Sequence, residues 1–204
     1  GSDVVTAIEA SGITQRLSQG DSPLRSALYR EFINPNRTGI IAYWPFEDAE
    51  GSASVASGLT DSPSMTFTGT PTFATSSVWA GSAELPEMGT ATFTGLVPGY
   101  TNTGEHSFRL LAYVPTAGPT SEGVLFKLQS SIGNVKSWQV LINTSGQLKP
   151  QAFDGSGTEL TGSTYVAFDL RGQLSNVILE VVQNGADIDW VLVVQDFDGL
   201  YFIT

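Results

Sequence analysis

Hydrophobic and polar residues alternate along most of the chain after Gly39, and this period of two is the pattern of β-strands. In DIDWVLVV, residues 187–194, Ile188, Trp190, Leu192 and Val194 face one side, and Asp187 and Asp189 face the other. The other segments with this pattern are SMTFTG, TATFTGLV, HSFRLLAYV, VLFKL, SWQVLI, QLKPQAF, STYVAFDL and NVILEVV. Roughly ten to twelve strands are expected, which predicts two packed antiparallel sheets in a jelly-roll sandwich.

Turn signals separate these segments. Asn184-Gly185 lies between the last two long segments and predicts a tight hairpin. NTSGQ and DGSGTE, residues 143–147 and 154–159, predict longer hairpin turns. The hairpins favour neighbouring strands that run antiparallel.

The stretch GIIAYWPFEDAEGSAS, residues 39–54, runs from alternating apolar residues into acidic turn chemistry. Its first half predicts the opening strand of the sandwich. Pro45 cannot donate to a central ladder, so this strand should lie at an edge or end at the proline. We expect Trp44 to be buried and the acidic residues to lie at the rim of the sheet.

The segment SPLRSALYREFINP carries the one persuasive helix signal. Ser22 is the expected N-cap and Pro23 the first helical residue, and Asn34-Pro35 ends the helix. Leu24, Ala27, Leu28 and Phe32 would form its apolar face. The chain therefore divides into an N-terminal strand/helix appendage, residues 1–38, and a β-sandwich, residues 39–204.

Composition narrows the class of protein. The chain has 204 residues, a net charge of −11 and no cysteine. Residues 38–204 hold sixteen acids against five bases, and a body this acidic repels nucleic acid. No disulfide is possible, and no apolar run is long enough to cross a membrane, so membrane insertion is not expected. The leading Gly1-Ser2 is typical of a cloning remnant, so we expect the chain to be a piece of a longer protein.

Two resemblances add to this picture. AYWPFEDAEGS, LTDSPSMTFTGTPTF and SAELPEMGTATFTG together resemble the opening of concanavalin-like lectin/glucanase domains of laminin-G type, over about residues 39–200. IEASGITQRLSQGDSPLRSALYR, followed by AYWPFEDAEG and later by VAFDLRGQ and NGADIDWVLVVQDFDG, is similar to minor tail proteins of actinobacterial phages and prophages. In that family a laminin-G-like sandwich follows a tail-hub-like segment, which residues 1–38 would represent. The family continues beyond GLYFIT, where this chain stops.

Catalytic chemistry is poorly represented. Glucanases of this fold carry a Glu-x-Asp-x-x-Glu strand, and no such triplet is present. Glu47 and Glu50 are three apart and would face opposite sides of a strand. His106 is the only histidine and begins an apolar strand face, where an edge residue is a simpler interpretation than a general base. We expect no enzymatic activity, although carboxylates from distant positions would still allow a glycan-degrading depolymerase.

Calcium is the one metal that the sequence makes worth weighing, because calcium prefers carboxylate and carbonyl oxygens. Many laminin-G-like domains bind it at the rim of the sandwich. Asp187, Asp189 and Asp48 are the candidate ligands, from acid-rich turns and strand ends. The simpler interpretation of each acidic turn is solvated turn chemistry.

Carbohydrate binding requires an exposed aromatic side chain with polar neighbours. Trp79 in TSSVWAGS and Tyr100 in VPGYTNTGEH are the candidates, with Asn102 beside the tyrosine. Loop packing is the alternative for both aromatic residues. The other three tryptophans lie on apolar strand faces and should be in the core.

These observations predict a non-catalytic module of a phage tail-tip protein that adheres to a host-surface glycan. The alternative is a structural scaffold that contacts other tail proteins and binds no sugar. The resemblance implies a location at the virion tail tip, other tail proteins and host polysaccharide as partners, and a homotrimeric assembly.

Overall fold

The computed structural model describes residues 26–76, 85–101, 104–131, 133–185, 187–196 and 201–203. The chain forms two compact units, residues 1–99 and 100–204. Each unit is described by itself. The predicted boundary after residue 38 concerns a different point of the chain and stays a prediction.

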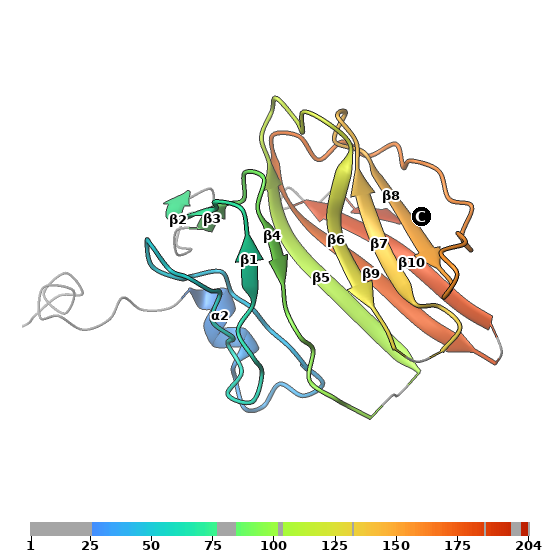
Figure 1. Ribbon diagram of the computed structural model, residues 1–204, viewed down its shortest axis with the longest axis horizontal. Coiled ribbons are helices and arrows are strands. Elements are labelled where there is room, and N and C mark those ends of the chain that lie inside the picture. The colour runs from blue at the N-terminus through green and yellow to red at the C-terminus, as the bar shows by residue number, and fades with distance from the viewer. Residues whose placement is uncertain are drawn as a thin grey trace, which may run out of the picture. The chain divides into compact units, whose positions relative to one another are not determined.

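The described residues form an antiparallel all-β fold, as predicted, with a single short helix (Figure 1). They hold eleven strands, which lie in four sheets rather than in two. The first unit contains helix α2 (Ala27–Phe32) and strands β1 (Thr66–Thr68), β2 (Thr72–Ser76), β3 (Leu85–Glu87) and β4 (Thr92–Thr94). The second contains β5 (Glu105–Val114), β6 (Gly123–Gln129), β7 (Ser137–Ile142), β8 (Leu148–Phe153), β9 (Gln173–Asn184), β10 (Asp187–Asp196) and β11 (Tyr201–Ile203).

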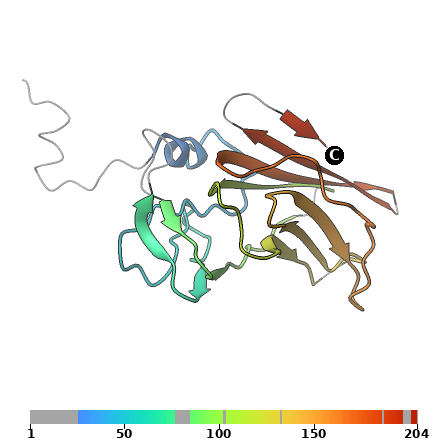
Figure 2. The same cartoon turned by 90° about the horizontal axis from the view of Figure 1, so that it is seen from above.

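The second unit is sandwich-like, with two sheets that face each other. One sheet has the strand order β11-β10-β9-β5, and the other has the order β6-β7-β8. Figure 2 shows the two sheets as separate layers. The hairpin predicted at Asn184-Gly185 joins β9 to β10, with Asn184 opposite Asp187 and Gly185 at a φ of 63°. The predicted turn at 143–147 joins β7 to β8 and is closed by a bond from Asn143 N to Gln147 O of 3.0 Å.

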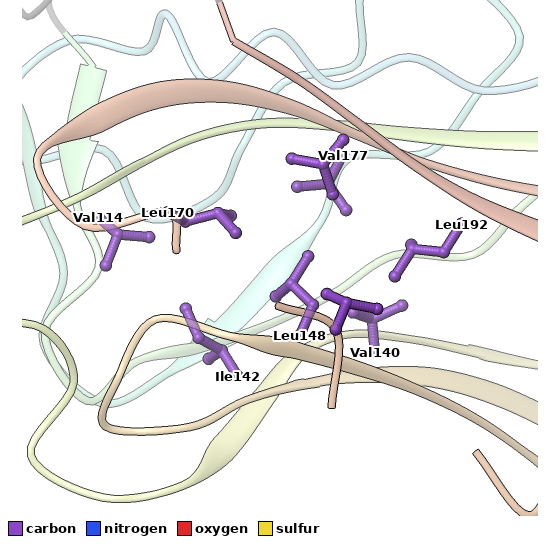
Figure 3. Packing of buried hydrophobic residues seen from close by; sticks show 9 residues of the cluster. Val114, Val140, Ile142, Leu148, Leu170, Val177 and Leu192 are labelled. Carbon is purple, nitrogen blue, oxygen red and sulfur yellow. The ribbon is translucent and has the colours of Figure 1, made fainter. Parts of the chain in front are cut away.

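The core of this unit lies between the two sheets. Figure 3 shows Val177 and Leu192 of one sheet pointing toward Leu148 and Val140 of the other. These four side chains are fully buried. The predicted alternation places Val114 of β5 and Leu192 and Val194 of β10 on this inner face, because successive strand residues point to opposite sides.

Residues 159–170, here called the edge segment, run along the free side of β8. The segment was predicted in part as the strand STYVAFDL, and this prediction is wrong because its hydrogen bonds to β8 and to the turn before β8 are irregularly spaced. Leu160 N donates to Ala152 O, Val166 N to Leu148 O, and Leu170 N to Gly146 O. Val166 and Leu170 are buried in the core cluster, so the segment still closes this side of the sandwich.

The first unit is held by aromatic side chains rather than by long strands. Phe67 and Phe93 are directly paired across β1 and β4, with ring centroids 5.5 Å apart. Phe73 contacts both of these rings, and Phe46 contacts Phe93.

The strand predicted at the start of residues 39–54 does not form, since residues 38–49 carry no strand. Pro45 lacks an N–H, and Phe46 has a φ of 59°, which ends the extended run. Trp44 is partly buried and donates from Nε1 to Pro63 O over 2.9 Å.

Helix α2 confirms the predicted helix but begins later than expected. Its N-cap is Ser26 rather than Ser22, because the Ser26 hydroxyl accepts a bond from Tyr29 N at 3.0 Å. Ser22, Pro23 and Leu24 lie outside the described residues. Glu47 accepts two bonds from Ser26, one from N at 3.1 Å and one from the hydroxyl.

Candidate functional site

The outer face of the β6-β7-β8 sheet carries polar residues in its middle, and its residues form transverse rows. Lys127 of β6 is opposite Gln139 of β7, which is opposite Gln151 of β8. In the next row Gln129, Ser137 and Phe153 are neighbours in the same order. The inner face of the same strands carries the core residues, and a further outward row, Val124, Leu141 and Lys149, is mostly apolar.

These rows form a shallow groove of about 580 Å³, which we call the outer-sheet groove. The residues that line it are Lys127, Gln129, Lys136, Ser137, Gln139, Phe153, Asp154, Gly155, Ser156 and Gly157. The strands fix its floor, and the turn after β8 forms its end.

A chain of amide hydrogen bonds fixes the middle row. Gln139 Nε2 donates to Gln151 Oε1 over 2.8 Å, and Gln151 Nε2 donates to Glu159 Oε2 over 2.9 Å. Gln151 is buried, and its amide orientation is fixed because it accepts from Gln139 and donates to Glu159. Gln139 keeps its carbonyl oxygen and one further N–H for a ligand, because an amide has two donors and an acceptor.

The turn after β8 is held by the carboxylate of Asp154. Its Oδ1 accepts bonds from Ser156 N, the Ser156 hydroxyl and Thr158 N, at 2.8, 2.7 and 2.8 Å. The bond from the Ser156 hydroxyl, with those from the backbone, holds the pKa of Asp154 below its ordinary value. Among the described residues, Asp154 is the only carboxylate that lines the outer-sheet groove. A carboxylate that stays charged and is engaged by its own turn is poorly suited to act as a general acid.

A second hollow of about 270 Å³ lies beneath the edge segment, between Trp190 of β10, Pro150 of β8 and residues 161–166. The Ser163 hydroxyl donates to Pro150 O, and the Tyr165 hydroxyl donates to Glu122. Burial and then the bond to Glu122 raise the pKa of Tyr165 to about 12. The hydroxyl groups of Ser163 and Tyr165 are thus engaged by the protein, so the outer-sheet groove offers more free polar groups.

The predicted carbohydrate residues are distributed as follows. Trp79 and Asn102 lie outside the described residues. Tyr100 is 45% exposed, and its ring packs edge-on against His106 with centroids 5.3 Å apart. The Tyr100 hydroxyl lies 3.4 Å from His106 Nε2. His106 belongs to β5 in the other sheet, so Tyr100 is not part of the outer-sheet groove.

The predicted calcium ligands lie in both units. Asp187 and Asp189 are exposed on β10, and Asp189 Oδ2 accepts a bond from Asn184 Nδ2 at 3.0 Å. Asp48 belongs to the first unit, where its Oδ1 accepts from Ala56 N at 3.0 Å. Its Oδ2 is buried and has no hydrogen-bond partner among the described residues. Within the described part of the chain, no three acidic or histidine side chains form a group that would hold a metal ion.

Trp138 and Trp190 are partly buried rather than fully buried. Their ring centroids lie 6.3 Å apart, and Trp190 packs against the core cluster. The predicted core position is confirmed in part for Trp190, and Trp138 contacts Trp190 without being one of the core residues.

Sequence reasoning missed Gln139, Gln151 and Phe153 as site residues. The signal was present in SWQVLI and QLKPQAF, where the positions between the apolar residues are the outward ones. The alternation predicts which residues face outward. It does not predict which outward residues of different strands lie side by side, because that depends on sheet order and register.

Helices in the described residues are all too short or too polar to cross a membrane. No protein family, curated protein or solved structure matches the chain.

Proposed function

We propose that the second unit is a non-catalytic carbohydrate-binding module and that the outer-sheet groove is its binding surface. The observation that carries this proposal is the fixed amide row of Gln139 and Gln151 beside Phe153 in an open groove. Sugars present hydroxyl groups that pair with amide donors and acceptors, and apolar ring faces that pack on aromatic side chains.

The wider setting of this proposal comes from the sequence resemblance. A laminin-G-like jelly-roll in a phage minor tail protein would hold such a groove outward at the tail tip, toward host polysaccharide. The absence of a paired carboxylate in the groove lining favours adhesion over hydrolysis.

Glycan-array binding of the purified chain, with calcium and with chelator, tests the proposal. We expect Gln139→Ala and Phe153→Ala to weaken binding about tenfold or more, since each removes a contact with the ligand. Gln195→Ala is the matched control, because Gln195 is an exposed glutamine on β10 in the other sheet. Melting temperatures of the variants would show that each remains folded.

Three outcomes would redirect the proposal. Binding that is lost with Trp79→Ala or Tyr100→Ala but kept with Gln139→Ala would move the site to the residues predicted from the sequence. Binding that disappears with chelator alone would make calcium part of the site. No binding in either condition would favour the scaffold, in which the unit contacts other tail proteins.

A further inference from the structure

The chain has three lysines, and all of them lie on or beside the β6-β7-β8 sheet. Lys127 of β6 and Lys149 of β8 occupy outward positions, as the register with Gln139 and Leu141 of β7 shows. Lys136 directly precedes β7 and lines the outer-sheet groove with Lys127. A chain with a net charge of −11 thus concentrates its lysines on one sheet face.

Two carboxylates lie near these lysines: Asp154 lines the outer-sheet groove, and Glu159 accepts from Gln151 of the middle row. Both are hydrogen-bonded by other groups, and the three lysines outnumber them. None of the three lysines forms a salt bridge with a described residue. The ion pairs among the described residues are Arg37–Glu31 and Arg171–Asp169. Lys136 Nζ donates to the carbonyl oxygen of Ser131 over 3.0 Å, and this bond leaves its charge in place.

The outer face of the other sheet is net negative, with four acidic residues and one base, Arg109 of β5. Glu105 and Asp189 occupy one row across β5, β9 and β10, with Val182 between them. Glu180 lies in the adjacent row, and Asp187 is at the hairpin end of β10. The two outer faces of the same sandwich-like unit therefore differ in the sign of their charge.

We propose that the outer-sheet groove takes an acidic polysaccharide, in which carboxylate or phosphate groups recur along a chain of sugar or polyol units. This inference rests on the proposed carbohydrate-binding function and names the class of glycan. The lysines attract the anionic groups, and the amides of the middle row pair with hydroxyls. The rest of the acidic surface repels the same polymer, so the module binds it with one face only.

Polygalacturonate and its fully methyl-esterified form are the probes, because they share a backbone and differ in charge. The full chain should bind polygalacturonate more tightly than the ester. Binding should weaken at least several-fold between about 50 mM and about 200 mM salt, because salt screens the attraction. The double variant Lys127→Gln/Lys136→Gln, at the two lysines that line the groove, should lose about tenfold or more in affinity. Glu180→Gln on the opposite face is the matched control and should bind as tightly as the original chain or more so.

A glycerol-phosphate polymer serves as a second anionic probe. Lysine-dependent binding to it rather than to polygalacturonate would support the proposal and identify phosphate as the recognised group. Equal binding of polygalacturonate and its ester, insensitive to salt and to the lysine substitutions, would overturn the acidic-glycan inference and leave carbohydrate binding intact. Failure of every charged and neutral glycan to bind would overturn the proposed function itself.

Discussion

Tyr43 shows how one side chain links the helix to the loop that follows it. Its ring lies against Phe32, with centroids 4.9 Å apart, and near Tyr29, at 6.1 Å. Its backbone oxygen accepts a bond from Gly58 N at 2.8 Å. Burial, followed by the negative charge of Glu47, raises the pKa of the Tyr43 phenol well above its ordinary value of 10.0.

A raised phenol pKa predicts alkaline destabilisation of the first unit. The folded protein holds the Tyr43 proton more tightly than the unfolded chain does. The contribution to stability is therefore complete below about pH 10 and is lost as the pH rises above that value. We expect the free energy of unfolding, measured by denaturant titration, to fall less between about pH 9 and about pH 11 in Tyr43→Phe than in the original chain. Tyr113→Phe, at a 42% exposed tyrosine, is the control. Equal slopes in all three proteins would contradict the prediction.

For single residues, the sequence predicts which side of a strand a side chain occupies better than it predicts which other side chains it contacts. Glu47 was expected at a rim, and the structure joins it to the N-cap residue Ser26, which lies 21 positions earlier. Gln139 and Gln151 were outward residues of two predicted strands, and their amides form one row. A short-range pattern contains the period of a strand but not the long-range pairing that brings two side chains together.

Among the elements, helix α2 is too short to be stable by itself. It has six residues and therefore few internal hydrogen bonds, so contacts at its ends matter more than intrinsic propensity. The hydroxyl of Ser26 accepts a hydrogen bond from Tyr29 N at the helix N-terminus and donates one to Glu47.

Ser26→Ala should therefore destabilise the first unit by about 1 kcal/mol, the usual effect of losing an N-cap. Faster hydrogen exchange at the amide of Tyr29, together with the change in the free energy of unfolding, would measure it. Ser121→Ala replaces an exposed serine of the second unit and provides the comparison. A Ser26→Ala protein no less stable than Ser121→Ala would show that the cap contributes little.

The sequence was most informative for the long strands. The predicted segments at β5, β9 and β10 form strands of ten, twelve and ten residues. The strand predictions failed for residues 39–46 and for STYVAFDL, where apolar residues alternate but the backbone forms no regular strand pairing. Pro45 and the positive φ of Phe46 interrupt the first, and the second packs its alternate residues inward while bonding irregularly to β8. Apolar periodicity reports burial, which irregular segments also achieve.

At the scale of the whole molecule, each unit has its own cluster of packed side chains. The core cluster of the second unit lies entirely within residues 114–194. The aromatic cluster of the first unit lies within residues 46–93. The two units should therefore respond separately to core substitutions.

Leu148→Ala tests this separation. Leu148 is 0% exposed in the centre of the second unit, so the cavity should lower the free energy of unfolding by about 2–5 kcal/mol. Hydrogen exchange should accelerate across β5 to β10, while the Val55–Met65 bridge of the first unit changes little. Leu160→Ala, at a leucine that is 51% exposed, should have a small effect. Equal acceleration in both units would show that they unfold as one.

The edge segment has a consequence for association between molecules. An open sheet edge presents unpaired N–H and C=O groups, which recruit strands from other chains and begin fibril growth. Residues 159–170 occupy that position along β8, and they do so with irregular backbone that offers a poor template for a further strand. The chain therefore closes this edge of the sheet itself, which lowers the tendency of two molecules to join strand to strand at high concentration.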